Sequence, residues 1–175
     1  MKKLFACACV IVLGVSMATW AGDDKPVPTP KSTTSPGFDA LKKLVGTWTA
    51  PGPDGKPMET QFRLTAGGSV LVETLFPGSA EEMVTVYHMD GSDLILTHYC
   101  MLGNQPRLKA VSAKETKKLM IKSVGGTNMK MDDMHMGQAI LTLTDDDHYE
   151  ADWCSCSSGK PDDSHHVSMK FTRKK

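Results

Sequence analysis

The sequence predicts an all-β domain, a single antiparallel up-and-down barrel of about ten strands with a short N-terminal helix closing one end. Three observations predict it. Apolar and polar residues alternate in short runs, turn residues separate these runs at regular intervals, and Asp90-Gly91 joins two of the runs directly. An Asp-Gly pair between alternating runs is a strong indication of a hairpin.

The helix is expected over residues 38–45, because Phe38, Leu41, Leu44 and Val45 recur at helical spacing. The segment is short and apolar on one side. A helix of this kind at the start of a barrel could cover one of its open ends.

Strands are expected throughout the rest of the chain. Val167, Met169 and Phe171 alternate with polar residues, which is typical of a half-buried strand. The pair 83–89 and 94–101 carries large apolar groups on both faces, so its inward face stays open. The predicted strands are 47–50, 58–66, 69–76, 83–89, 94–101, 108–112, 119–124, 138–144, 148–154 and 165–172, with a longer connection over 125–137.

The N-terminus has the pattern of a signal peptide over residues 1–21. Lys2 and Lys3 precede an apolar stretch, and Thr19-Trp20-Ala21 places small residues where cleavage would occur. An uncleaved anchor is the alternative. Residues 22–37 are rich in proline and poor in apolar groups, so we expect a disordered linker. The barrel would then occupy residues 38–175 of a periplasmic or secreted protein, with no membrane span after cleavage.

Charge and cysteine content narrow the functional classes. The formal net charge is zero, which does not favour nucleic acid as a partner. Cys100, Cys154 and Cys156 would remain after signal cleavage in an oxidising compartment. Three thiols cannot all pair within one chain, so we expect one disulfide among these candidates and one free thiol.

The order of several short motifs resembles a family. The motifs are Leu44-Val45-Gly46-Thr47-Trp48, 67–73, 83–88, 97–100, 104–107 and the later stretch from Asp147 to Lys160. Over residues 38–173 the chain is similar to secreted bacterial lipocalin-like proteins of unknown function. The resemblance implies a calycin-like barrel whose end is packed by Trp48 with Arg173 over its ring, and it implies no particular activity. In outline the chain also resembles haem-binding nitrobindin barrels.

The leading functional expectation is non-enzymatic binding of a small, largely apolar molecule inside the barrel. Barrels of roughly eight strands or more can leave room for one such ligand. The candidate lining and rim residues are aromatic or polar and lie on or beside predicted strands. They are Trp48, Phe62, Tyr87, His98, Tyr99, Asn104, Gln105, Arg107 and Trp153.

A second expectation is a periplasmic copper or haem site in the loop over residues 129–136. Clustered thioethers with an imidazole suit Cu(I). The candidate ligands are Met129, Met131, Met134, His135 and Met136. The alternative is that some of these side chains simply pack onto the barrel mouth.

A third hypothesis is an enzyme that acts on a small hydrophobic substrate, and a fourth is a purely structural role. His98 and Cys100 share a strand face but lie too far apart along it for a nucleophile and its base. The sequence contains none of the common catalytic motifs, so no catalytic residue is assigned. No resident cofactor is expected, apart from the copper or haem named above.

Overall fold

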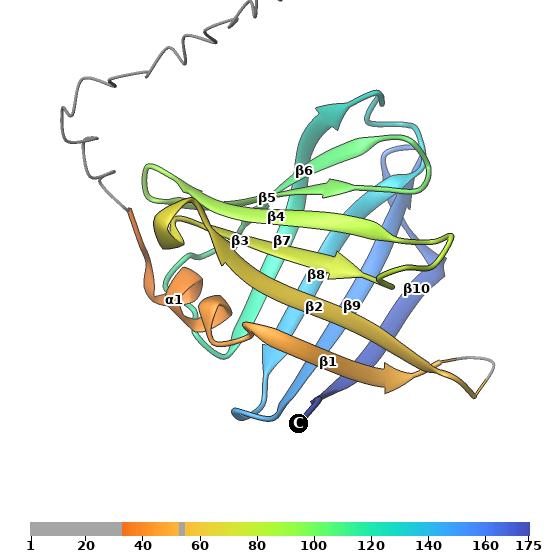
Figure 1. Cartoon of the computed structure of the whole chain (residues 1–175). Coiled ribbons are helices and arrows are strands. Elements are labelled where there is room, and N and C mark those ends of the chain that lie inside the picture. Colours follow the sequence, from red (N-terminus) through yellow and green to blue (C-terminus); the bar gives the residue numbers. More distant parts are fainter. Residues whose placement is uncertain (1–32, 53–54) are drawn as a thin grey trace, which may run out of the picture.

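The structure is a computed structural model that describes residues 33–52 and 55–175, and it confirms the all-β fold class. Ten antiparallel strands form one closed barrel with one short helix at its end (Figure 1). The elements are α1 (Pro36–Lys42), β1 (Gly46–Pro51), β2 (Pro57–Thr65), β3 (Val70–Leu75), β4 (Met83–Asp90), β5 (Asp93–Tyr99), β6 (Gln105–Ala110), β7 (Lys118–Thr127), β8 (His135–Leu143), β9 (His148–Ser157) and β10 (Lys160–Arg173), with a short 3-10 turn, η1 (Ala66–Gly68).

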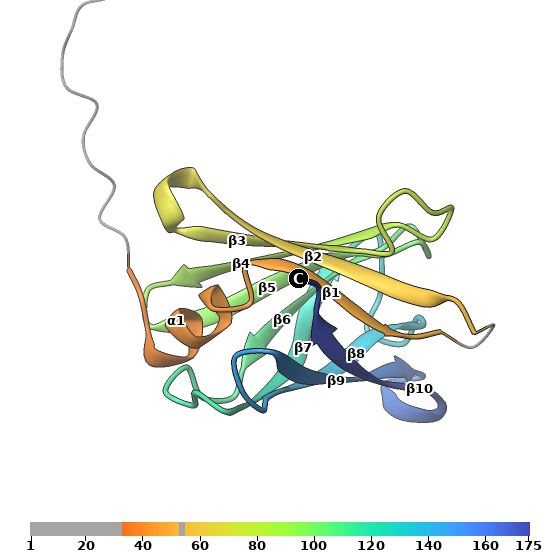
Figure 2. The same cartoon turned by 60° about the horizontal axis from the view of Figure 1, so that its bottom comes forward.

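Each strand pairs with its neighbour in sequence, and β10 closes the barrel against β1. Figure 2 shows β10 meeting β1 beside the C-terminus. The closing seam is short, since it registers Trp48 with Arg173 and Thr49 with Thr172. The predicted 83–89/94–101 hairpin is present, with Asp90 paired to Asp93 across its turn.

The structure shows which residues of the β4–β5 hairpin face the barrel interior. Tyr87 on β4 and Leu96 and His98 on β5 are almost completely buried, whereas Tyr99 is 51% exposed. Neighbouring residues on a strand point to opposite faces, so His98 faces the interior and Tyr99 the outside.

The helix begins two residues earlier than the sequence predicts. The Ser35 hydroxyl accepts a hydrogen bond from the Phe38 amide, and Pro36 occupies the first turn, where its missing N–H costs nothing. The helix ends at Lys42 rather than Val45. Residues 36 and 37 therefore belong to the helix and not to the expected linker.

The helix lies across one end of the barrel (Figure 1), and buried side chains pack in the interior behind it. Tyr149 is central to this packing. Its ring stacks on Phe171 with centroids 4.7 Å apart and meets Trp48 edge-on at 4.9 Å. Phe38 and Leu41 of α1 are fully buried against the same cluster. These buried side chains form the core of the barrel next to α1.

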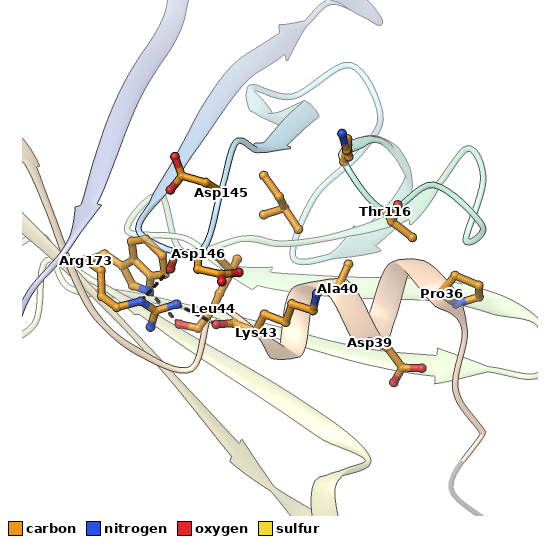
Figure 3. Close-up of a pocket in the computed structure, with 12 residues that line it drawn as sticks. Pro36, Asp39, Ala40, Lys43, Leu44, Thr116, Asp145, Asp146 and Arg173 are labelled. Carbon is orange, nitrogen blue, oxygen red and sulfur yellow. Dashed lines mark hydrogen bonds between the residues drawn. The ribbon is translucent and has the colours of Figure 1, made fainter.

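Arg173 closes this end from outside, as the resemblance implies. Its guanidinium carbon lies 4.1 Å from the centroid of the Trp48 ring. It also donates hydrogen bonds to the carbonyls of Lys43, Val45 and Asp146. Figure 3 shows Arg173 reaching towards Lys43 and Leu44 at the end of the helix. The contact joins the last strand to the helix and to the first strand.

The remaining strands match the predicted ones with shifted ends. β7 and β8 extend into the connection expected over 125–137, which shortens the loop to residues 128–134. The expected signal peptide and most of the expected linker lie outside the described residues. In the described part of the chain, no helix is long and apolar enough to cross a membrane.

Candidate functional site

The candidate site is a cavity at the barrel mouth, opposite α1. Its volume is about 310 Å³, near the lower end of the range for small-molecule sites. His98 and Trp153 line its deep part, with ring centroids 6.2 Å apart. Most of the other lining side chains are apolar, and five of them are methionines: Met83, Met101, Met134, Met136 and Met169. Thioether side chains adapt their shape to a partner, so this lining suits an apolar ligand.

Below the cavity, polar side chains form a row across neighbouring strands. Glu73 on β3 pairs in register with Thr85 on β4, and Thr85 pairs with His98 on β5. All three are at least 97% buried. His98 Nδ1 lies 3.0 Å from the Thr85 hydroxyl, and the Tyr87 hydroxyl donates to Glu73 at 2.7 Å. The row connects a buried carboxyl group to the imidazole that lines the cavity.

Burial shifts both titratable groups of this row. It raises the pKa of Glu73 to about 7, and hydrogen bonds from Tyr87, Thr60 and Thr85 lower that pKa only in part. Burial also lowers the pKa of His98 to about 4. Desolvation disfavours the charged form of each group, so the pKa of the acid rises and the pKa of the base falls. At neutral pH His98 is therefore an uncharged imidazole.

The structure separates the nine predicted lining residues. His98 and Trp153 line the mouth cavity. Trp48, Phe62 and Tyr87 point inward but belong to the packed core, so they do not line the cavity. Their burial follows from the aromatic cluster around Tyr149, which fills the space next to α1.

The predicted polar rim lies elsewhere. Tyr99, Gln105 and Arg107 border a depression on the outer wall of the barrel, and Arg107 forms an exposed ion pair with Asp90. Asn104 is buried and donates a hydrogen bond to the Met134 carbonyl, so it anchors a loop. These four residues do not line the cavity. Strand alternation places Tyr99 opposite His98, and Arg107 pairs with the outward-facing Thr97.

The five candidate ligands of the methionine-rich loop point to different places. Met134 and Met136 line the mouth cavity, while Met131 and His135 line a separate pocket on the outer wall. The Met129 sulfur lies against Gly126. The loop therefore does not form a single site from these five residues. A β-bulge at Met136–Gln138 interrupts the regular alternation of β8 between the interior face and the outer face.

The three described cysteines, Cys100, Cys154 and Cys156, are free thiols, so the structure does not contain the expected disulfide among them. Cys100 and Cys154 line the mouth cavity. Cys156 lines the outer pocket with His135. Burial and the neighbouring Cys154 raise the pKa of the Cys156 thiol.

Sequence reasoning missed Glu73, Thr85 and Thr60. The pattern in the sequence that could have found Glu73 is its place between Leu71 and Leu75, which puts a carboxylate on the apolar face of an alternating strand. Thr60 shares that interior, and its hydroxyl lies 3.5 Å from Glu73 Oε1.

A second cleft lies at the closed end, between α1 and the β8–β9 turn, with a volume of about 400 Å³ (Figure 3). Three of its charged side chains have partners within the protein. Arg173 binds backbone carbonyls, Asp39 pairs with Lys42, and Asp145 pairs with His148. We assign this cleft no ligand.

No protein-family model and no curated protein matches this chain. Among solved structures, a redesigned β-barrel is similar to it, with 15% sequence identity and a TM-score of 0.33. The match covers 78% of this chain and 96% of that one. The barrel architecture is established by the described strands and their closed pairing.

Proposed function

We propose that this protein is an exported, lipocalin-like barrel that binds a small, largely apolar molecule at its mouth and does not transform it. One observation carries the proposal: buried side chains form the core next to α1, and the other end of the barrel keeps a cavity of about 310 Å³ lined by Trp153 and five methionines. An apolar cavity with a few polar groups at its base is the usual form of a small-molecule site.

The polar row below the cavity supports a narrower ligand class. The Thr85 hydroxyl has one hydrogen, and Thr85 lies directly opposite Glu73 in the β3–β4 register. We infer that an ionised Glu73 carboxylate attracts that hydrogen. Thr85 then accepts from His98 Nδ1–H, which leaves Nε2 as an acceptor. The ligand that complements this acceptor is an apolar molecule with one hydroxyl or N–H donor, such as a phenol or an alcohol. An anionic carboxylate is disfavoured because it would meet an uncharged acceptor.

The test is calorimetric titration at pH 8 with a matched pair of probes, 4-propylphenol and 4-propylanisole. The two share the propylphenyl group, but only the phenol donates a hydrogen bond; the anisole carries an O-methyl group in place of that hydrogen and so has the larger apolar surface. We expect the phenol to bind about tenfold more tightly, because an unmade hydrogen bond at a buried acceptor costs roughly 1–3 kcal/mol.

Two variants identify the site. His98→Leu should keep apolar binding and lose the preference for the phenol, while Met136→Trp should block both probes by filling the cavity. His88→Leu, on the outer face of β4, is the matched control and should behave like the wild type. Binding of neither probe by the wild type, or an unchanged preference in His98→Leu, would refute the proposal.

A further inference from the structure

The outer pocket beneath the 128–134 loop brings together three soft metal donors. It is lined by Met131 from the loop, His135 at the start of β8 and Cys156 near the end of β9. His135 and Cys156 are directly opposite one another in the β8–β9 register. Side chains of opposed residues on one face lie about 4.5–5.5 Å apart at Cβ, within reach of a shared ligand.

The His135 ring has a nitrogen lone pair available for a metal ion. Its Nδ1 lies 2.7 Å from the Asp133 carbonyl oxygen, so Nδ1 carries the hydrogen and Nε2 keeps its lone pair. The residue is 1% exposed, and its Nε2 has no hydrogen-bond partner among the described residues. A buried acceptor without a partner is costly. A ligand at Nε2 would remove that cost.

Gly137 makes room for the thiol. A Cβ atom placed on Gly137 would lie 2.0 Å from the Cys156 sulfur and 2.8 Å from its Cβ. The Cys156 side chain therefore rests directly on the bare backbone of β8, next to His135. Any larger residue at position 137 would displace the sulfur from this position.

We propose that His135 Nε2, the Cys156 thiolate and the Met131 thioether form a binding site for a Cu(I) ion on the outer wall of the barrel. A thiolate and a thioether with one imidazole form a soft donor set, which suits Cu(I). No three His, Cys, Asp or Glu side chains gather elsewhere in the described ranges, so a harder ion has no comparable site there. On binding, the Cys156 S–H bond breaks and its proton passes to solvent as the Cu–S bond forms. The copper remains Cu(I).

This site differs from the five-residue loop site that the sequence suggests. It keeps Met131 and His135, adds Cys156 from a distant strand, and excludes Met129, Met134 and Met136. It is also separate from the mouth cavity, so it does not depend on the proposed ligand-binding function.

The experiment is an anaerobic titration of the full chain with Cu(I), in competition with the chromogenic chelator bicinchoninate. The wild type should bind one more equivalent of Cu(I) than Cys156→Ser. In His135→Ala the Cu(I) affinity of this site should fall by about 100-fold, a loss typical of removing a metal ligand or its support. Cys154→Ser and Met129→Leu are matched controls and should keep the equivalent.

Gly137→Ala separates a metal role from a merely structural one. It leaves all three donors in the chain but displaces the Cys156 sulfur, so Cu(I) affinity should fall while circular dichroism still shows the barrel. X-ray absorption of the loaded wild type should show sulfur and nitrogen neighbours, and the sulfur contribution should shrink in Met131→Leu. Equal Cu(I) binding by the wild type and Cys156→Ser would overturn the proposal. A loss confined to Cys154→Ser would also overturn it.

Discussion

Among single residues, Glu73 and His98 are unusual because each is buried in the interior and has no ion-pair partner in the described part of the chain. The carboxyl group of Glu73 accepts from hydroxyl groups, and the His98 ring meets a threonine hydroxyl and a tryptophan ring. Buried ionisable groups of this kind respond to pH by losing their charge. Their shifted pKa values lead to a prediction about stability.

The two groups should have opposite effects on the pH dependence of stability. Between pH 4.5 and about 7 the folded protein keeps a proton on Glu73 that the unfolded chain has lost, so this group lowers stability as pH rises. Between about pH 4 and 6.5 the unfolded chain holds a proton on His98 that the folded protein lacks, so this group raises stability as pH rises. Each effect amounts to about 3 kcal/mol over its range.

We therefore expect little pH dependence from this pair in the wild type between pH 4.5 and 6.5, since the two effects cancel. Glu73→Gln should show stability rising with pH over that range, and His98→Asn should show it falling. Urea denaturation at several pH values measures both slopes, with the exposed Glu81→Gln as control. Parallel profiles for wild type and Glu73→Gln would contradict the prediction.

At the scale of elements, the short helix depends on Arg173 more than on its own sequence. Seven residues are too few for a stable isolated helix. Arg173 caps its C-terminal end by donating to the Lys43 and Val45 carbonyls, and Gly46 makes room for it. Gly46 has φ +130°, and a Cβ there would lie 3.0 Å from the guanidinium. Helix, first strand and last strand are thus held at one point.

Arg173→Lys should destabilise the protein by about 2 kcal/mol, because an ammonium group cannot reproduce the planar fork that serves several carbonyls. Hydrogen exchange in residues 37–44 should accelerate together with the loss of stability in urea. Arg63→Lys, on the exposed face of β2, is the same change without these contacts and should leave both measurements unchanged. If the two variants behaved alike, the capping role of Arg173 would be disproved.

At the scale of the whole molecule, the barrel depends on a short seam between its first and last strands. Beyond the pairs Trp48–Arg173 and Thr49–Thr172, the Lys174 amide donates to the Thr47 carbonyl. Phe171, which precedes these residues in β10, stacks on Tyr149 in the core. The end of the chain therefore both closes the sheet and completes the packing.

Deletion of residues 171–175 should abolish cooperative unfolding, because β1 loses its partner and the core loses Phe171. Tryptophan emission should shift to the red as Trp48 becomes exposed. Removal of Lys175 alone is the control, and we expect it to retain the wild-type transition in urea. A sharp transition at an unchanged midpoint in the longer deletion would show that the barrel does not need its closing strand.

The fold class was predictable from the sequence, because alternation, turn residues and the Asp90-Gly91 hairpin are local features that act before any long-range contact forms. Of the nine residues proposed for the lining and rim, the aromatic residues Trp48, Phe62, Tyr87 and Trp153 are buried, since large aromatic groups on alternating strands bury apolar surface. Register across strands could not be read in this way.

Which residues meet became visible only in the folded barrel. It joined Glu73, Thr85 and His98 in one row, although they lie on three strands, and it directed Tyr99 and Arg107 outward. It also divided the methionine-rich loop between two pockets and brought Cys156 beside His135. Pairing of strands distant in sequence sets these contacts, and a one-residue shift of register would exchange the faces of each strand.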